Sequence, residues 1–297
     1  MKVLFFGSDF FTKIISEIYQ EAGHETRIMG RASLIQKVQA VKDVLWCDEV
    51  YLVSGRNLNS VKLLRLAMAL KKRIIIHWTG TDVVQAMQQY QKDHVVPNAQ
   101  YPHIDLAVAS HLQQELLEIG IHAAYVPIAS QDLNFRVLPA PETHMVLCYL
   151  PEGRETFYGI EILKALAKKH PEVPFCILAN DGGKDAQKLP NLHYMGTVGR
   201  KKMEELFGKC SVLLRYPEHD GLPVMMLEAQ GFGRQVIHRY PFPYVITPEE
   251  DSIESIDAAL RKVLSEPPRV NQEGADYVRR EFTKERILQR YREAGVI

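Results

Sequence analysis

The chain has 297 residues, 46% of them hydrophobic, and its 36 Lys and Arg residues balance its 36 Asp and Glu residues. This length suits two domains with a core each, the zero net charge disfavours nucleic acid as a partner, and no segment reaches the roughly 20 apolar residues of a membrane span. Four widely spaced cysteines, mostly within apolar runs, indicate neither zinc nor disulfides, so the composition predicts a soluble protein of the cytoplasm.

The first half of the chain alternates short β-branched runs with amphipathic stretches. Helical patterns lie, for example, at residues 11–21, 58–70 and 112–119. Strands that are apolar on both faces and separated by helices form parallel sheets covered on both sides, so this half predicts a doubly wound, Rossmann-like sheet. The expected strands are residues 3–6, 26–29, 50–53, 73–77, 106–109 and 124–126.

Polar residues follow two of these expected strands. Gly7 and Ser8 come directly after the first strand, where they would shape an acceptor pocket, although a helix cap at Ser8 or Asp9 explains these residues equally well. His77, Thr79 and Asp82 lie at the end of the strand at 73–77, and an α/β sheet places its ligand at the carboxyl ends of its strands. Thr81 or Asp82 would also serve as the cap of a helix at 83–90, an interpretation that we favour for Asp82, whereas we favour a site role for His77.

A second alternation follows a segment rich in loop residues. Pro127, Asn134, Pro139 and Pro141 interrupt the pattern and predict an interdomain connector. Two successive arrays of similar size predict two Rossmann-like domains that face a cleft, one of residues 1–137 and one of residues 138–282. The second array is expected to have strands at 145–149, 175–179, 193–195, 211–214 and 235–237, and helices at 156–169, 201–208, 223–230, 252–264 and 271–280.

The most informative segment, residues 211–229, has the pattern of a buried strand, a polar turn and a helix. Residues 219–221 have turn chemistry, and Pro223 suits the first helical position, where its missing N–H costs nothing. The amides around Leu222 and the positive end of the helix dipole would face the carboxyl end of the strand, which favours an anionic phosphate. Glu228 would lie about a turn and a half into the helix, where its carboxylate can accept hydrogen bonds from a sugar diol. The segment therefore predicts a nucleotide-sugar site.

The same segment resembles a family motif. Asp220 and Glu228, with seven residues between them, resemble the acid–seven–acid motif of the GT-B glycosyltransferases, particularly the retaining group called family 4. These enzymes usually have Glu where this chain has Asp220, whereas Gly221 and Glu228 match. The likeness extends from about residue 146 to residue 245, and more loosely over the whole chain. It implies the two-domain α/β fold, with the last helix, within residues 283–297, packed on the N-terminal domain.

The resemblance also implies which residues hold the donor. In many of these enzymes an Arg and a Lys that precedes a Gly clamp the diphosphate, and an Arg suits this role because its fork donates two hydrogen bonds. Arg154 matches that Arg, or is an exposed loop residue, but Tyr158 stands where the Lys would be. Arg215 would supply the missing charge and His219 would contact the sugar or the phosphate, although structural pairing, for instance with Glu218, explains both as well. The further donor residues that the resemblance implies are Gly196 and Val198 near the base, and Gly221, Leu222 and Pro223.

Several motifs of other enzyme classes are missing from the sequence. It contains no Asp-x-Asp, no glycine-rich dinucleotide fingerprint and no P-loop. We therefore expect a metal-independent glycosyltransferase without a cofactor, which moves a sugar from a nucleotide diphosphate sugar to an unknown hydroxyl, with retention as the resemblance implies. The expected catalytic residues are His77, Asp220 and Glu228, and the expected acceptor residues are Gly7, Ser8, Thr79 and Asp82.

Two other functions and several acceptors fit the same sequence. A nucleotide-sugar 2-epimerase would share the diphosphate clamp, and product analysis without an acceptor would reveal it. A non-catalytic sugar- or nucleotide-binding partner subunit is favoured by Tyr158 and by Asp220 in place of Glu. The expected acceptor is a glycan, a lipid or a small molecule, and the basic clusters at 71–73 and 200–202 leave a weak contact with a membrane surface open.

Overall fold

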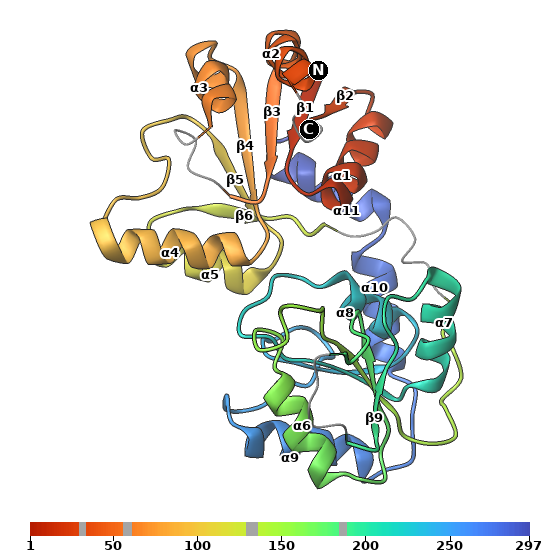
Figure 1. The fold of residues 1–297 in the computed structure, drawn as a ribbon. Helices are drawn as coiled ribbons and strands as arrows, with labels where there is room; N and C mark the ends of the chain where they lie inside the picture. The colour runs from red at the N-terminus through yellow and green to blue at the C-terminus, as the bar shows by residue number, and fades with distance from the viewer. Residues whose placement is uncertain (30–33, 56–60, 129–135, 184–188) are drawn as a thin grey trace. The chain divides into compact units, whose positions relative to one another are not determined.

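The structure, a computed structural model, describes residues 1–29, 34–55, 61–128, 136–183 and 189–297. The chain forms two compact units (Figure 1). The first unit consists of Met1–Gln131, His219–Leu222 and Phe282–Ile297, and the second of Asp132–Glu218 and Pro223–Glu281. Each unit contains one sheet of parallel strands flanked by helices, which confirms the predicted fold class.

The first unit contains a six-stranded sheet in the order β2-β1-β3-β4-β5-β6. The expected strands of this half are all present, with ends within two residues of those predicted. Most of the β-branched and aromatic residues of the inner strands β1, β3 and β4 are buried in the sheet. Its strands are β1 (Lys2–Phe6), β2 (Glu25–Ile28), β3 (Glu49–Val53), β4 (Arg73–Trp78), β5 (Ile104–Ala107) and β6 (Ala123–Tyr125). Its helices are α1 (Asp9–Glu21), α2 (Leu34–Trp46), α3 (Lys62–Ala69), α4 (Thr81–Asp93), α5 (Ser110–Glu118) and α11 (Lys284–Glu293).

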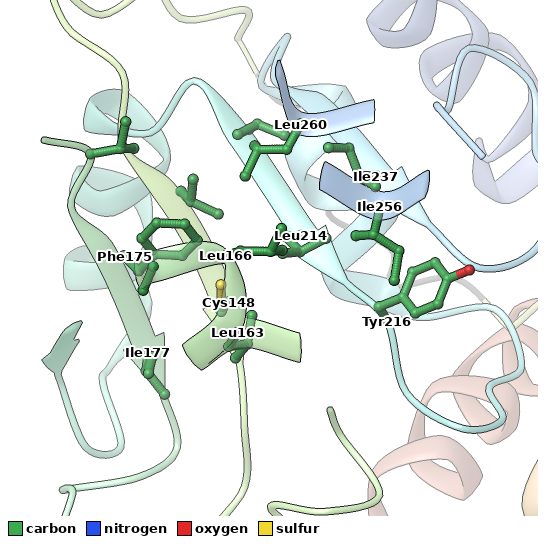
Figure 2. Packing of buried hydrophobic residues seen from close by; sticks show 14 of the residues in the cluster. Cys148, Leu163, Leu166, Phe175, Ile177, Leu214, Tyr216, Ile237, Ile256 and Leu260 are labelled. Carbon is green, nitrogen blue, oxygen red and sulfur yellow. The ribbon is translucent and has the colours of Figure 1, made fainter. Parts of the chain in front are cut away.

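The second unit contains a five-stranded sheet in the order β11-β10-β7-β8-β9. Figure 2 shows its core, in which side chains from the strands meet side chains from α6 and α9. Its strands are β7 (Val146–Tyr149), β8 (Phe175–Leu178), β9 (Leu192–Tyr194), β10 (Val212–Arg215) and β11 (Gln235–His238). Its helices are α6 (Ile160–Lys169), α7 (Arg200–Lys209), α8 (Val224–Gly231), α9 (Ile253–Leu264) and α10 (Gln272–Glu281).

The strand order places a topological switch point in each sheet. In the second unit, β8 and β9 lie on one side of β7, whereas β10 and β11 lie on the other. In the first unit the order reverses between β1 and β3. Open α/β sheets bind ligands outside the carboxyl ends of the strands at such points, so the loops after β7 and β10 and those after β1 and β3 are the places to look for a site.

Helix α11 is anchored on the first unit's sheet by buried polar contacts. The Tyr291 hydroxyl lies 3.2 Å from the Tyr51 hydroxyl, and Arg73 donates a hydrogen bond of 2.9 Å to the carbonyl of Val296. The hydroxyl of Thr283 caps the helix, since it accepts from the amide of Arg286 at 3.1 Å. The C-terminal segment is therefore part of the structure of the first unit.

Two helices begin about four residues later than the sequence predicts. The helix expected at 156–169 begins at Ile160, because Gly159 has a left-handed backbone (φ 80°) and residues 155–159 form turns. The helix expected at 58–70 is described from Lys62 as α3, and its residues 58–60 lie outside the described residues, as does Asn134 of the expected connector. In the part of the chain that the structure covers, none of the helices combines the length and apolar character that crossing a bilayer requires.

Candidate functional site

The start of α8 is a place where the second unit presents backbone donors. Pro223 is the residue before the helix, with φ −70° and ψ 125°, rather than its first residue as predicted. The extended ψ lets its carbonyl accept hydrogen bonds from the amides of Met226 at 3.0 Å and Leu227 at 3.4 Å. Within the described residues, the amides of Val224 and Met225 donate to no protein acceptor. The positive end of the helix therefore keeps two donors for an anion.

Two arginines meet at Tyr158, beside the switch point of this sheet. Arg154 follows β7, and its guanidinium carbon lies 5.3 Å from the centre of the Tyr158 ring and 4.4 Å from that of Phe157. Arg215 ends β10, and its guanidinium carbon lies 5.3 Å from the Tyr158 ring and 5.1 Å from that of Tyr149. Aromatic faces attract cations without neutralising their charge. The two guanidinium groups therefore form a positively charged cluster at the ends of β7 and β10.

Gly159 brings the start of α6 close to the same place. A Cβ atom at this position would lie 2.9 Å from the carbonyl oxygen of Tyr216, the residue after β10, and the backbone φ is 80°. Both conditions favour glycine. The Tyr158-Gly159 pair thus sets the aromatic ring next to Arg215, at the position where the sequence comparison expected a lysine.

Glu228 is half-buried on α8 and has unused hydrogen-bonding capacity. In the described part of the chain its carboxylate accepts no hydrogen bond, and burial raises its pKa, an effect that the charge of Arg200 reduces. Arg200 is the first residue of α7, after Gly199. A half-buried carboxylate without hydrogen-bond donors is suited to accept hydroxyl groups from a ligand.

Gly196 and Val198 lie in the loop after β9, in the same unit. The amide of Gly196 donates to the carbonyl of Asn180 at 2.8 Å, and its own carbonyl accepts from the amide of Ala179 at 2.8 Å. These two bonds fix the loop to the end of β8. Val198 is half-buried.

Residues 219–222 group with the first unit. His219 Nε2 lies 2.9 Å from Glu115 Oε2, so Glu115 of α5 is an acidic partner of His219, whereas the sequence had suggested Glu218. His111 Nε2 lies 2.9 Å from the carbonyl oxygen of Asp220, and the Asp220 carboxylate accepts from the amide of Gly221 at 3.1 Å. A Cβ atom on Gly221 would lie 2.1 Å from the Thr79 carbonyl oxygen, which excludes any side chain there.

Leu222, the last residue of this short segment, is buried. His111 and Glu115 of α5, which contact Asp220 and His219, were not among the predicted site residues. Their separation from residues 219 and 220 by more than a hundred positions leaves no signal in a single sequence.

Gly7 and Ser8 lie at the switch point of the first unit. A Cβ atom on Gly7 would lie 2.2 Å from the carbonyl oxygen of Val53 at the end of β3, so only glycine fits. Ser8 precedes α1 and is exposed, and its side chain makes no capping hydrogen bond. The helix cap that the sequence offered as the alternative role of Ser8 is therefore absent.

His77 is fully buried, and both of its ring nitrogens have protein partners. Nδ1 lies 2.7 Å from the hydroxyl of Tyr51, and Nε2 lies 2.7 Å from the carbonyl oxygen of Val126. Burial lowers its pKa to about 4, so the ring is neutral at physiological pH and donates one hydrogen bond to Val126 while it accepts one from Tyr51. This enclosure corrects the expectation of a catalytic role: His77 is a structural residue and we leave it out of the proposed site.

Asp82 binds backbone amides. Its carboxylate accepts from the amides of Gly80 at 2.7 Å and Thr79 at 3.0 Å, and also from the amide of Gly55. Burial raises the pKa of Asp82, and the three amides counteract that rise. Asp82 is therefore not the cap of a helix at 83–90, because α4 begins at Thr81 after Gly80; from the first turn of the helix it fixes the loop at residues 79–80 instead.

The described residues contain no group of three or more His, Cys, Asp or Glu side chains placed to hold a metal ion.

No protein-family model matches the chain, and none of the curated proteins matches it. Solved structures do match. The sucrose-phosphate synthase of Thermosynechococcus elongatus has a TM-score of 0.66 and 12% identity over 98% of both chains.

Two further structures were solved with UDP. S. aureus TarM has a TM-score of 0.63 and 11% identity over 87% of this chain, which spans only 58% of the length of TarM. An alpha-glucosyltransferase, solved with UDP and a 13-mer DNA, has a TM-score of 0.53 and 10% identity over 98% of this chain and 95% of its own. These neighbours are GT-B glycosyltransferases, and the chain has their fold.

Proposed function

We propose that the protein is a glycosyltransferase that takes a sugar from a nucleotide diphosphate sugar and attaches it to a hydroxyl group of an acceptor. One arrangement in the second unit carries this proposal. The guanidinium groups of Arg154 and Arg215 meet at Tyr158. Among the residues that the structure describes, two amides at the start of α8 have no protein acceptor and the half-buried Glu228 has no hydrogen-bond donor. The cations and amides suit a diphosphate, and the carboxylate suits a sugar diol.

These groups would act on the bond that breaks. As the bond between the sugar and the diphosphate is cleaved, negative charge grows on the departing diphosphate oxygens. Arg154 and Arg215 would donate paired hydrogen bonds to those oxygens, and the amides at the start of α8 would add fixed dipoles. Donors that are already in place when charge develops stabilise the transition state more than the ground state. We propose that they make a metal ion unnecessary, and that the sugar keeps its anomeric configuration.

The residues next to α8 and in the β9 loop would complete the donor site. Asp220 and Gly221 directly precede α8 in the chain, together with His219 and Leu222, and we propose that this turn contacts the transferred sugar. Gly196 and Val198 would contact the nucleotide base, because their loop is fixed by backbone hydrogen bonds at the end of β8. We assign no nucleophile to the protein.

A non-catalytic binding subunit is the second candidate, and Tyr158 is the observation that favours it. A tyrosine supplies no charge to a diphosphate, which would weaken both binding and turnover. Arg215 weighs against this candidate, because its guanidinium carbon lies 5.3 Å from the Tyr158 ring and places a cation at the same position.

Thermal unfolding with a panel of UDP, ADP, GDP, CDP and TDP, each with and without EDTA, tests the donor site. One of these ligands should stabilise the protein by roughly 2.7 kcal/mol at a hundredfold excess over its dissociation constant, with or without EDTA. Glu228→Ala should lose this stabilisation. The matched control Glu204→Ala, an exposed position on α7 of the same unit, should keep it. No stabilisation by any ligand would overturn the donor site, and binding without transfer to any acceptor would favour the binding subunit.

A further inference from the structure

The first unit contains a cavity of about 280 Å³ between one face of α4 and residues 95–100. Gly55, after β3, and Trp78, the last residue of β4, also line it. The cavity therefore opens from the carboxyl edge of the sheet, where α/β proteins bind their ligands. Its volume is just below the range of roughly 300–1,000 Å³ that is usual for pockets of drug-sized ligands, which suits a ligand of about one sugar ring.

The charge of the lining excludes one class of ligand. Its polar side chains are those of Asp82, Gln85, Gln89, Asp93, Asn98 and Gln100, and none of the described residues that line it is Lys, Arg or His. A hydrogen bond from Gln89, followed by one from the amide of Val95, lowers the pKa of Asp93, so this carboxylate is charged at neutral pH. The charged carboxylate of Asp93, with no cation among the described lining residues, repels phosphate and carboxylate groups. A ligand here is uncharged or positively charged.

The remaining lining matches a polyhydroxylated ring. Amide and carboxylate side chains donate to and accept from hydroxyl groups, and Gln85 and Gln89 lie on the exposed face of α4. Trp78, Ala86 and Val95 supply an apolar wall. Small-molecule sites commonly combine an apolar wall with a few placed polar groups, and a sugar ring has apolar C–H faces bordered by hydroxyl groups. The two acids alone would not define a ligand, whereas the volume of the cavity and its amide side chains do.

We infer that this cavity binds an uncharged sugar ring and serves as the subsite for the acceptor of the glycosyl transfer. The assignment of the bound sugar as the acceptor rests on the proposed function, whereas the binding of the sugar does not. The proposal excludes acceptors whose phosphate or carboxylate would have to enter this cavity. Asp93 supplies the charge of the lining, and Gln85, Gln89 and Asp93 supply the hydrogen bonds to the ring.

The two tryptophans of the chain allow a direct test. Trp78 lines the cavity, and Trp46 lies on α2 beside Arg27. In the full-length protein labelled with 5-fluorotryptophan, fluorine NMR should show two resonances, which Trp46→Phe assigns. At least one of the neutral sugars glucose, galactose and N-acetylglucosamine should shift the Trp78 resonance and leave that of Trp46 unchanged. Glucose 6-phosphate and glucuronate should shift neither.

A pair of neighbouring glutamines on α4 provides the matched variants. Gln89 lines the cavity and Gln88, also exposed, does not. Gln89→Ala should weaken binding of the neutral sugar roughly fivefold, the effect of one lost hydrogen bond, and Gln88→Ala should leave it unchanged. The proposal is overturned if no neutral sugar at saturating concentration shifts Trp78, if the charged sugars shift it equally, or if both variants bind alike.

The same samples separate this proposal from the proposed donor site. Nucleoside diphosphates should leave the Trp78 resonance in place while they stabilise the protein against heat. If a sugar shifts the Trp78 resonance but no nucleotide binds, the sugar-binding cavity stands and the donor site is rejected. If a nucleotide binds but no sugar shifts the Trp78 resonance, the donor site stands and the sugar-binding cavity is rejected.

Discussion

The two sheets differ in how much hydrogen-bonding capacity the polar residues at their carboxyl edges leave unsatisfied. In the first unit, His77 has protein partners at both ring nitrogens and Asp82 accepts from three backbone amides. In the second unit, Arg154 lies against aromatic rings, and Glu228 accepts no hydrogen bond from the residues that the structure describes. Polar residues thus occur at the strand ends of both units. A polar residue at a strand end marks a ligand site only where folding leaves its bonding capacity unsatisfied.

The largest expected effect concerns His77. His77→Ala should destabilise the protein by about 3 kcal/mol, because it leaves a cavity and removes the partners of Tyr51 and Val126. Binding of nucleoside diphosphates should not change, since the first unit's histidine has a structural role. Denaturant unfolding and calorimetric titration measure the two effects. A variant of normal stability that has lost glycosyl transfer would restore the catalytic role that the sequence suggested.

Arg215 should show the opposite pattern. Arg215→Ala should weaken nucleoside diphosphate binding by about 2 kcal/mol, the usual worth of hydrogen bonds to a charged group, which calorimetric titration measures as an increase in Kd. Arg269→Ala removes a highly exposed arginine of the second unit and serves as the control. If the two variants bind equally well, the arginine cluster at Tyr158 is not the diphosphate site.

Buried Glu49 should make the stability of the first unit depend on pH. Burial raises its pKa from 4.5 to about 7, although Arg73 lies 2.8 Å away and lowers it. The unfolded chain loses this proton near pH 4.5 and the folded protein near pH 7. The stability that the protonated carboxyl contributes is therefore fully present below pH 4.5 and is lost as the pH rises through 7.

The pH series has a simple readout in unfolding free energy. As the pH rises, the free energy of unfolding should fall by no more than about 1.4 kcal/mol per pH unit. Glu49→Gln should remove the part of this pH dependence that Glu49 causes. Glu25→Gln, at an exposed position of β2, should retain it. An unchanged pH profile in Glu49→Gln would show that Arg73 keeps the carboxylate charged throughout.

The smallest expected effects compare a serine before a helix in each unit. The hydroxyl of Ser252 accepts from the amide of Ser255 at 3.1 Å and caps α9, whereas Ser8 makes no such bond before α1. Ser252→Ala should cost about 1 kcal/mol and Ser8→Ala less than about 0.5 kcal/mol. Midpoints of chemical denaturation measure both. Equal costs would mean that Ser8 has a structural role that the structure does not show.

Much of the fold follows from local patterns, because strands that are buried on both faces have long apolar runs and the loops between them contain turn residues. The predicted strand at 73–77, for example, is Arg73–Trp78 in the structure. Local patterns did not predict which way its last residues face. When both faces of a strand are buried, the alternation that would separate an enclosed His77 from an exposed one disappears.

The candidate site follows from the sequence in part. The glycine and the proline of the turn before α8 indicate an anion site, and two amides there have no acceptor among the described residues. The stacking of Arg154 and Arg215 on Tyr158 and the pairing of His219 with Glu115 depend on side chains that are distant in the chain. No local pattern encodes such contacts, although the Tyr in place of Lys had already directed attention to Arg215 as the cation that would replace the Lys.

Hydrogen exchange of the full-length protein, with and without the nucleoside diphosphate that stabilises it most, tests the central claim most directly. Backbone amides at a ligand site slow their exchange when the ligand occupies it. We predict slower exchange at residues 155–163 and 222–230, above all at Val224 and Met225, which have no protein acceptor in the described structure. Exchange at residues 74–82 should not change. Slower exchange confined to residues 74–82, or none at the start of α8, would contradict the account.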